Sequence, residues 1–305
     1  MNTAMVREHA KGFENICGDL RCREPMSRHT SWRVGGPAEY FFVPADRADL
    51  IRFLACLPNE VPLLWLGLGS NLLVRDGGFP GAVVCLHRGL SRLSRERGNT
   101  VHAEAGVTCA QVARFSVTEG LAGAEFLAGI PGTVGGALAM NAGAFGGETW
   151  AITSAVEVID RRGRISRQPA DAFEVGYRSV SAASETWFIS ADFTLHPDGK
   201  TPGRTKIHSH LAERAGQQPV QSANAGSVFR NPPGDYAGRL VEAAGLKGLR
   251  HGGAVVSAQH ANFIINDGGA TAGDIEALIS EVQLQVADQL GVALEPEVRI
   301  AGVTS

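Results

Sequence analysis

The sequence predicts a mixed α+β protein with more than one domain. Its 305 residues are enough for one large domain or for two to three domains of modest size. Helical and strand-like hydrophobic patterns alternate along the chain. The turn-rich segment 196–203 then separates a strand-rich part from a part with longer helices. We therefore expect two sheet-containing regions followed by a smaller and different unit.

The composition excludes several classes of protein. Hydrophobic residues make up 44% of the chain and the net charge is -3, so no basic surface for nucleic acid or membranes is expected. The five cysteines are irregularly spaced and form no CxxC pair, which argues against a zinc site or a disulfide framework. We expect no metal and no obligate protein partner. Because neither a signal peptide nor a membrane-spanning run is visible, a cytoplasmic location is expected.

The first region begins after a leader, residues 1–27, in which periodicity is weak. Asp46 is a candidate N-cap for a helix whose apolar face contains Leu50, Phe53 and Leu54. Apolar runs at 62–66 and 82–86 predict two buried strands, the first of which runs into a glycine-rich loop. This pattern indicates an αβ unit with a ligand loop at its strand end.

The second region continues this alternation. The segment 101–105 alternates like a strand, and Thr108 with Gln111 forms a capping box that opens a helix. Gly120 stands where that helix should end. Further strands of a second sheet are expected at 155–160, 164–167 and 187–195.

The last region has helices with clear starts and stops. A long helix is predicted from Thr271 to its C-terminal glycine, Gly291. We also expect a strand that contains Ser227 and a final strand over 292–300 that carries Glu297. The remaining predicted elements are helices at 204–214 and 236–244 and short strands near Val255 and Phe263.

Two glycine-rich loops predict a site for a phosphorylated cofactor. Loop one is residues 67–73, and loop two is residues 129–136, continuing to 141–144. Glycines let consecutive N–H groups point at one anion, and Ser70, Asn71 and Thr133 add side-chain donors. Neither loop has the lysine of a P-loop, and Leu72 replaces the third glycine of the Rossmann fingerprint. The alternative is that both loops are only tight turns.

Three distant residues suggest the chemistry. Ser227 lies in a small-residue segment that ends in Asn231-Pro232, while Arg178 follows a tyrosine and Glu297 lies near the C-terminus. A serine, an arginine and a glutamate can together place a proton next to a carboxylate. With the cofactor loops, they indicate a redox enzyme that acts on an unsaturated acid.

At these segments the chain resembles the bacterial UDP-N-acetylenolpyruvoylglucosamine reductase (MurB) family. The resemblance runs from about residue 28 to 302, nearly the whole chain, with its segments in the family's order. The matching segments are 30–38, 67–76, 129–146, 176–178, 225–252, 260–266 and 294–300.

The resemblance implies an α+β fold: a vanillyl-alcohol-oxidase-like FAD-binding region of two α/β subdomains, followed by a smaller α+β substrate-binding domain. The implied domain ranges are 28–200, with subdomains at about 28–95 and 96–200, and 201–305. It implies non-covalently bound FAD, with NADPH as the hydride donor. The cofactor-binding positions would be Arg33, Gly67, Gly69, Ser70, Asn71, Gly129, Ile130, Pro131, Gly132, Thr133, Gly135, Gly136, Asn141 and Gly143.

The implied reaction is a cytoplasmic step of peptidoglycan precursor synthesis. UDP-N-acetylglucosamine enolpyruvate is reduced to UDP-N-acetylmuramate, with hydride passing from flavin N5 to C3 and a proton from Ser227 to C2. Arg178 would hold the carboxylate, and Glu297 in its protonated form would stabilise the enolate-like intermediate. Tyr177, Arg178 and Asn231 are the implied substrate contacts.

Some positions depart from the family pattern. Val180 stands where a serine is usual, and the segment 213–217 is less basic than expected. The long insertion that carries a substrate-clamping tyrosine is missing, so the chain resembles the shorter subtype. Two other readings stay open: an FAD-dependent oxidase, whose tether could be Cys109 or His102, and a non-catalytic flavin-binding module. None of Arg178, Ser227 and Glu297 is lost, which favours the reductase.

Overall fold

The computed structural model describes residues 12–199 and 202–305. The described chain divides into two compact units, and it passes between them several times because neither is continuous in sequence. Unit 1 contains 12–22, Tyr40–Leu68 and Gly81–Ala212, and unit 2 contains Arg23–Glu39, Gly69–Pro80 and Glu213–Ser305. Loop one is therefore split between the units after Leu68. The domain ranges that the resemblance implies stay a prediction.

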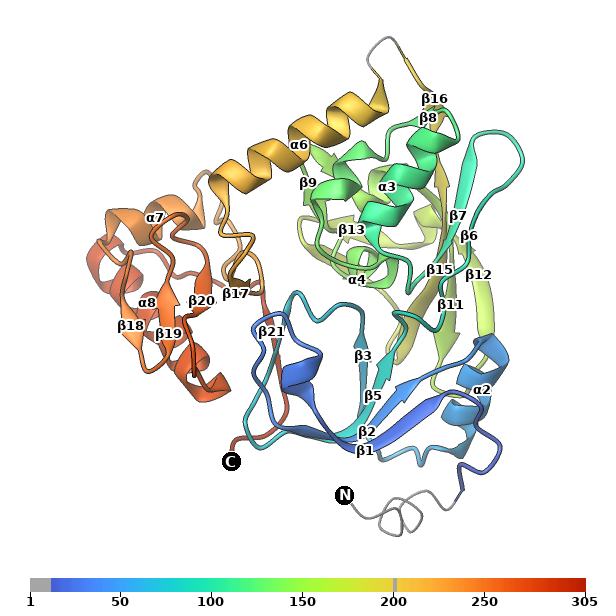
Figure 1. Ribbon diagram of the computed structural model, residues 1–305, viewed down its shortest axis with the longest axis horizontal. Coiled ribbons are helices and arrows are strands. Elements are labelled where there is room, and N and C mark those ends of the chain that lie inside the picture. The colour runs from blue at the N-terminus through green and yellow to red at the C-terminus, as the bar shows by residue number, and fades with distance from the viewer. Residues whose placement is uncertain (1–11, 200–201) are drawn as a thin grey trace. The chain divides into compact units, whose positions relative to one another are not determined.

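A four-stranded sheet begins the fold, with the strand order β1-β2-β5-β3 (Figure 1). Strands β3 and β5 are parallel, as expected of an αβ unit. Helix α2 begins at its predicted N-cap, since the Asp46 carboxylate accepts a hydrogen bond from the Asp49 N–H. The outer strand β1 falls in the segment assigned to the leader. The bounds are β1 Asp19–Pro25, β2 Pro37–Val43, α2 Arg47–Cys56, β3 Leu63–Leu66 and β5 Phe79–Cys85.

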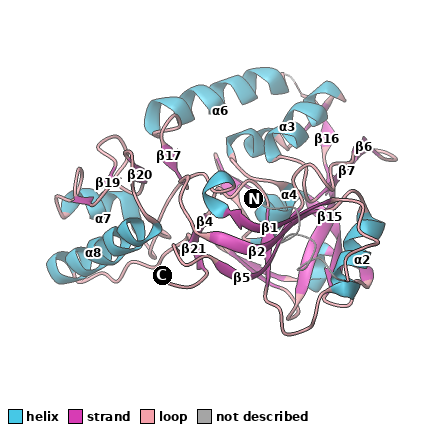
Figure 2. Cartoon of the chain, turned by 60° about the horizontal axis from the view of Figure 1, so that its bottom comes forward, coloured by secondary structure: helices cyan, strands magenta, loops and turns pink. Residues whose placement is uncertain are grey.

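The second sheet of unit 1 is antiparallel and has the order β12-β11-β15-β7-β6. One face is apolar: Val101 and Ala103 pack with Val112 of α3 and Leu138 of α4 in one buried cluster. Figure 2 labels β6, β7 and β15 of this sheet together with α3 and α4. Helix α3 begins with the predicted capping box of Thr108 and Gln111. The bounds are β6 Leu93–Arg95, β7 Thr100–Glu104, α3 Cys109–Thr118, α4 Val134–Ala139, β11 Thr153–Asp160, β12 Ile165–Pro169 and β15 Thr186–Thr194.

Small elements complete unit 1, and two of them are hairpins that matter for the site. Strand β9, at the end of loop two, pairs with β10. The hairpin β13–β14 has Tyr177 and Arg178 as its two turn residues. The bounds are β8 Leu121–Ala122, β9 Gly143–Ala144, β10 Gly147–Glu148, α5 Thr149–Ile152, β13 Glu174–Gly176, β14 Ser179–Ser181 and β16 His196–Pro197, with 3-10 turns η2 Glu125–Gly129 and η3 Ala170–Ala172. Helix α6, Gly203–Gln217, leads into unit 2.

Unit 2 is built on the four-stranded sheet β17-β20-β19-β18, against which α8 packs (Figure 1). Helix α8 has the predicted ends, with Thr271 as its N-cap and Gly291 at φ 69° as its C-cap. Trp32 is fully buried in this core, and its indole N–H donates to the Ile264 carbonyl at 2.7 Å. The bounds are η1 Met26–Arg28, β4 Leu72–Val74, β17 Ala223–Asn224, α7 Ala237–Ala243, β18 Arg250–His251, β19 Ala254–Val256, β20 Ile264–Asn266, α8 Ala272–Leu290 and β21 Arg299–Ala301.

Two predicted strands are wrong. Ser227 lies in an irregular segment after β17, because Gly226 adopts φ 75° and turns the chain out of an extended path. The final strand covers only Arg299–Ala301, and Glu297 precedes it. Pro296 has no N–H to give to a ladder, so this stretch makes only an isolated bridge between Phe229 and Pro296.

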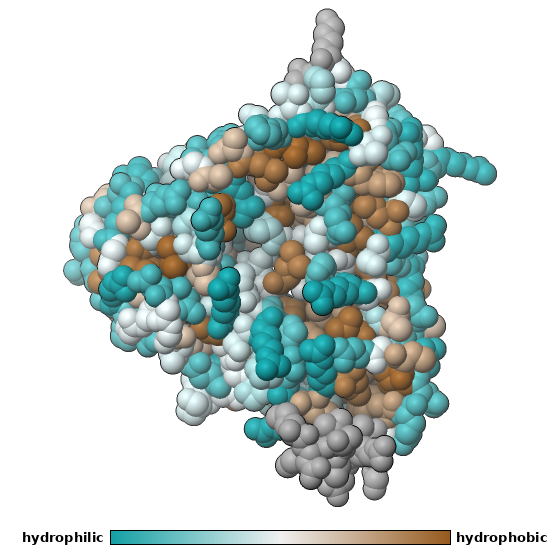
Figure 3. Space-filling model, in the orientation of Figure 1, coloured by the Kyte–Doolittle hydropathy of each residue, from teal (hydrophilic) through white to brown (hydrophobic). Residues whose placement is uncertain are grey.

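The surface carries mixed side chains. On the face shown in Figure 3, hydrophobic residues lie in several separate areas between hydrophilic ones. The exposed large hydrophobic side chains come from distant parts of the sequence, among them Tyr177, Leu211, Tyr236 and Leu284. Among the residues that the structure describes, no helix is both long and apolar enough to span a bilayer.

Candidate active site

The Ser227 segment is held on one side by an asparagine. Val228 N–H donates to the Asn262 carbonyl at 2.9 Å, and Phe229 N–H donates to the Asn262 side-chain oxygen at 2.9 Å. The Asn262 amide group in turn donates to the Phe229 carbonyl at 2.8 Å. Asn262 is buried, so these bonds are shielded from water. The Asn262 side chain therefore satisfies backbone groups of a segment that was predicted to be a strand.

On its other side the same segment is held by the residues around Glu297. Glu297 N–H donates to the Val228 carbonyl at 2.7 Å, and Arg230 N–H donates to the Glu295 carbonyl at 2.9 Å. Ser227 and Glu297 thus lie next to a shared backbone hydrogen bond, although 70 positions separate them in the sequence. The structure brings these two predicted catalytic residues together within unit 2.

Asn71 of loop one also contacts the backbone around Glu297. The Asn71 amide donates to the Glu297 carbonyl at 3.1 Å, and Arg299 N–H donates to the Asn71 carbonyl at 3.1 Å. Just beyond these residues, β4 and β21 pair in parallel from Leu72 and Arg299 onward. Asn71, predicted to bind the cofactor, therefore also fixes the backbone of Glu297.

The start of unit 2's part of loop one is tightly packed. Gly69 has φ 66°, and a Cβ atom built on it would lie 2.0 Å from the His29 carbonyl oxygen, so only glycine fits. Its own carbonyl accepts from the Ser31 N–H at 3.1 Å. Arg33, another predicted cofactor residue, follows at φ 60° in the same turn. Ser70, which follows Gly69 in the sequence, is partly exposed.

In unit 1 the two glycine loops meet. A Cβ atom built on Gly67 would lie 2.4 Å from the Thr133 hydroxyl oxygen, so the end of β3 touches loop two. Backbone bonds fix loop two to its surroundings. Cys109 N–H donates to the Gly132 carbonyl at 3.0 Å, and Gly135 N–H donates to the Ala105 carbonyl at 2.9 Å. Gly129, Ile130 and Pro131 precede this contact, and Gly136 lies in the first turn of α4.

Arg178 and Tyr177 lie at the tip of the β13–β14 hairpin, also in unit 1. The Arg178 guanidinium donates to the Asn141 carbonyl at 3.3 Å and to the Gly143 carbonyl at 3.2 Å. Its central carbon lies 5.4 Å from the centre of the Tyr177 ring, and that ring is half exposed. Val180 packs against the buried cluster of unit 1, which anchors the base of the hairpin.

Two further predicted positions have identifiable local roles. The Asn231 side-chain oxygen accepts from the Ala237 N–H at 3.0 Å, at the start of α7. Arg214 is the basic residue of the 213–217 segment, and burial lowers the pKa of its guanidinium. Asn262 is a residue that the sequence-based site prediction missed. Its signal was its place in the 260–266 motif, but nothing local marks it as the holder of Ser227.

The two side chains considered as flavin tethers are engaged elsewhere. Cys109 is fully buried, and burial raises the pKa of its thiol to about 12, which suppresses the reactive thiolate. His102 lies on the polar face of the second sheet, with Nδ1 2.7 Å from an Asp192 carboxylate oxygen. Neither arrangement supports the oxidase reading.

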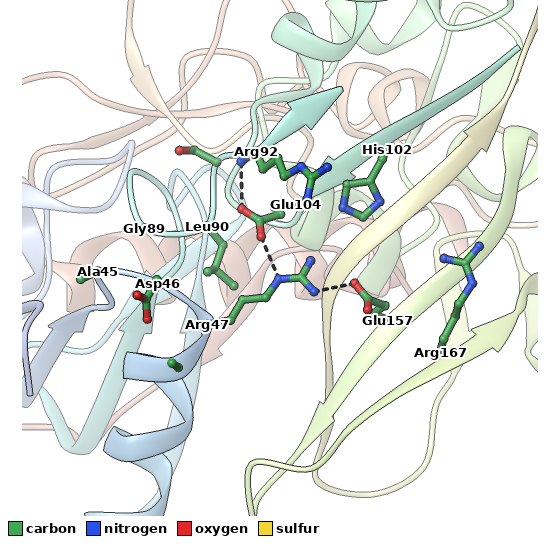
Figure 4. Close-up of a pocket in the computed structure, with 12 residues that line it drawn as sticks. Ala45, Asp46, Arg47, Gly89, Leu90, Arg92, His102, Glu104, Glu157 and Arg167 are labelled. Atoms are coloured by element: carbon green, nitrogen blue, oxygen red, sulfur yellow. Dashed lines mark hydrogen bonds and ion pairs between the residues drawn. The ribbon is translucent and has the colours of Figure 1, made fainter. Parts of the chain in front are cut away.

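A cavity of about 690 Å³ lies on that polar face (Figure 4). Arg47 reaches over it from the start of α2 and bridges Glu104 and Glu157, at 2.8 Å in each case. Glu104 also accepts from the Arg92 N–H. Because the cavity's charges compensate one another, we interpret it as a structural ion-pair network where α2 meets the second sheet.

The residues of the two loops fit a dinucleotide cofactor. A pyrophosphate needs closely approaching backbone N–H groups, hydroxyl donors and no nearby carboxylate. Gly67 and Thr133 are in contact, which brings small residues and a hydroxyl together in unit 1. Neither loop one nor loop two contains an acidic residue. In unit 2 the continuation of loop one supplies Gly69, Ser70 and Asn71.

Comparison with known proteins assigns the family. The family model described as "FAD binding domain" matches residues 38–168, and that described as "UDP-N-acetylenolpyruvoylglucosamine reductase, C-terminal domain" matches residues 218–301. The chain is 56% identical to the UDP-N-acetylenolpyruvoylglucosamine reductase of Alkalilimnicola ehrlichii, over 93% of this chain and 95% of that protein. The chain belongs to the UDP-N-acetylenolpyruvoylglucosamine reductase family. Its relative of the same name in Methylococcus capsulatus is also 56% identical, over 92% of each chain.

A solved structure agrees with this assignment to the family. The reductase of Thermus caldophilus superposes with a TM-score of 0.78 at 32% identity, covering 93% of this chain and 98% of that one. The predicted fold, an FAD-binding region followed by the family's C-terminal domain, is confirmed. The predictions of an FAD-dependent oxidoreductase of peptidoglycan precursor synthesis, with NADPH as hydride donor, are confirmed by membership of the family.

Proposed function

We propose that this chain reduces the enolpyruvyl ether of UDP-N-acetylglucosamine enolpyruvate to UDP-N-acetylmuramate, with Arg178, Ser227 and Glu297 as its catalytic residues. The observation that carries the proposal is the bond between Glu297 N–H and the Val228 carbonyl, which places Glu297 beside the Ser227 segment. Asn71 of loop one holds the same stretch of backbone. The backbone of Glu297 is thereby joined to the segment that carries Ser227 and to the side chain of Asn71 in loop one.

Bound FAD, once reduced by NADPH, supplies the hydride that C3 of the enolpyruvyl group receives. We assign its binding to loop one, to residues 129–136 of loop two, and to Arg33 and Gly143, as the family resemblance implies. Gly67 and Thr133 lie in contact, so the two loops can serve one pyrophosphate from both sides.

Arg178 binds the substrate carboxylate. Its guanidinium is planar and permanently charged, so it can form two parallel bonds to a carboxylate and stabilise the negative charge that spreads into it. Tyr177 lies under that guanidinium and keeps its plane in place through a cation–π contact. We assign a further substrate contact to Asn231, four residues after Ser227.

Ser227 donates the proton that C2 requires. A hydroxyl is a weak acid in water, but the carbanion-like C2 is basic enough to take its proton when the two are in contact. Glu297, in its protonated form, donates a hydrogen bond to the developing enolate. One hydride at C3 and one proton at C2 convert the methylene and ether carbon to a methyl group and a tetrahedral centre, which balances the reaction.

The missing tyrosine-bearing insertion supports the shorter subtype of the family. UDP-N-acetylglucosamine enolpyruvate and NADPH are the proposed small-molecule partners, and a nucleotide-sugar substrate supports a cytoplasmic location.

The test is an anaerobic stopped-flow experiment on wild type and Ser227→Ala. NADPH should bleach the flavin of both proteins at similar rates, because Ser227 has no role in that step. Adding the enolpyruvyl substrate should restore the colour of the wild type and do so about 10²- to 10⁴-fold more slowly in Ser227→Ala. Ser209→Ala, at an exposed position on α6, is the matched control.

Other results of this stopped-flow experiment would contradict the proposal. Recolouring of Ser227→Ala at the wild-type rate would remove Ser227 as the donor. Wild-type flavin that ignores the substrate and recolours quickly in air would indicate an oxidase. A protein that shows no flavin spectrum even after FAD is added would refute both.

A further inference from the structure

Arg178 occupies an unusual backbone position. Gly176 pairs with Ser179, so Tyr177 and Arg178 are the two central residues of a tight turn. Arg178 has φ 53°, a left-handed conformation that glycine or asparagine normally supplies at the second position of such a turn. For an arginine it is strained, and strain of this kind persists only where surrounding contacts hold it.

The contacts that hold the turn come from one short segment. The Arg178 guanidinium donates to the carbonyls of Asn141 and Gly143, at 3.3 and 3.2 Å. The Asn141 side chain bonds back to the hairpin, since its amide donates to the Gly176 carbonyl at 3.2 Å. The backbone carbonyl of Asn141 therefore binds the Arg178 side chain, and the Asn141 side chain binds Gly176 at the start of the turn.

The orientation of the Asn141 amide is fixed by its partners. Nδ2 donates to the Gly176 carbonyl and, at 3.0 Å, to a carboxylate oxygen of Glu148, and both of these groups can act only as acceptors. Oδ1 accepts from the Trp150 N–H at 3.2 Å. Both amide hydrogens are thus used inside the protein, and Asn141 itself is 1% exposed. No side-chain donor remains for a cofactor.

We propose that Asn141 is a positioning residue for Arg178 rather than a ligand of the flavin, with Glu148 fixing its amide. Asn141 holds the hairpin tip so that the guanidinium meets the substrate carboxylate in one orientation. Like Arg178, Asn141 has a left-handed backbone, φ 45°, so two unusual residues are locked together. The inference rests on the proposed role of Arg178 as the group that binds the substrate carboxylate.

The experiment is a double-mutant cycle on the FAD-loaded enzyme with Asn141→Gly, Arg178→Ala and the combination. Glycine accepts the left-handed backbone, so Asn141→Gly removes the three side-chain bonds without adding strain. Flavin content and absorption spectrum should match those of the wild type. Reoxidation of NADPH-reduced flavin by the enolpyruvyl substrate should slow roughly tenfold to a hundredfold, as expected for a misplaced catalytic group.

Non-additivity is the decisive result. The combined variant should be no slower than Arg178→Ala alone, because Asn141 acts only through that residue. If the combined variant slows reoxidation by the product of the two single effects, the proposal is overturned. It is also overturned if Asn141→Gly loses flavin but reoxidises normally once FAD is restored. If Arg178→Ala itself reoxidises normally, the proposed role of Arg178 fails instead, and the two failures are distinguishable.

Two variants separate positioning from general loosening. Glu148→Ala changes an exposed residue, and it should slow reoxidation by less than Asn141→Gly does. Thr149→Val deletes a 2.7 Å bond from a buried hydroxyl to the Ala142 carbonyl, next to Asn141 in the sequence but without a hairpin residue as partner. It should lower stability yet leave reoxidation near the wild-type rate. Equal slowing in Thr149→Val would contradict specific positioning.

Discussion

At the scale of single residues, the site depends on glycines whose neighbours leave no room for a side chain. The backbone of Gly67 is not left-handed, so its conformation does not require a glycine. A Cβ atom at this position, however, would lie 2.4 Å from the hydroxyl oxygen of Thr133 and 3.1 Å from the methyl group of Thr133. Thr133 is itself buried. The glycine is therefore required by the contact between two loops, which sequence spacing cannot show.

Gly67→Ala should destabilise the protein by about 1–3 kcal/mol, because the new methyl group forces buried Thr133 to move. Urea unfolding measures this, and flavin absorbance should show weaker FAD retention. Adding Thr133→Ala should recover part of the stability, since it removes the two atoms closest to the methyl group. Gly216→Ala is the control: nothing lies within 4 Å of its Cβ position in α6. Equal stability of Gly67→Ala and the wild type would contradict the contact.

At the scale of elements, helix ends carry much of the organisation of unit 2. Helix α8 has its own capping box, and the Asp76 carboxylate adds two bonds, accepting from Ala272 N–H at 3.0 Å and Gly273 N–H at 2.8 Å. Asp76 follows β4, so it links loop one's continuation to the helix that covers the sheet. Arg75 beside it forms a two-bond ion pair with Glu276 on the same helix.

Asp76→Ala should lower the free energy of unfolding by about 1–2 kcal/mol, through loss of two capping bonds and of a negative charge at a helix N-terminus. Guanidinium chloride unfolding at neutral pH is the measurement. Asp288→Ala changes an exposed residue near the other end of α8 and should have little effect. A loss in Asp288→Ala as large as in Asp76→Ala would show that the cap contributes nothing specific.

At the scale of the whole chain, carboxylates that are buried or partly buried set the response to acid. Burial alone would raise the pKa of Glu157, but hydrogen bonds from Ser190 and Arg47 and the charge of Arg47 hold it below its usual 4.5. Burial would likewise raise the pKa of Asp192. Hydrogen bonds from His102 and Arg167 and their charges outweigh burial, so this pKa lies below its usual 3.8. Such groups stabilise the fold fully above their unfolded pKa values and lose that contribution as pH falls through the lower folded values.

Stability should therefore decline below about pH 4.5 in the wild type, and Arg47→Met should decline less over the same range because the pKa of Glu157 is no longer held below its unfolded value. At pH 7 Arg47→Met should also cost about 1–3 kcal/mol, since two carboxylates lose a charged partner. Urea midpoints measured from pH 7 to pH 4 test both effects. Arg162→Met removes an exposed arginine as the control. Parallel pH profiles for Arg47→Met and the wild type would show that this pair does not set the response to acid.

The sequence by itself determined the helices whose ends are local. Asp46, Thr108, Thr271 and Gly291 stand where the structure has caps, because a cap needs only residues within one turn of the helix. It also determined the family, through motifs spread over nearly the whole chain. The glycine loops and the three proposed catalytic positions followed from those motifs and from no periodicity.

Only the tertiary structure decided how these residues are held. The Ser227 segment is paired with the Asn262 side chain and with the backbone around Pro296, not with regular strands, so the strands predicted at Ser227 and Glu297 did not form. The Arg178 turn was not predicted because an arginine at positive φ is stable only with the carbonyls of Asn141 and Gly143 beside it. Long-range contacts supply the free energy for both arrangements, and local sequence does not contain them.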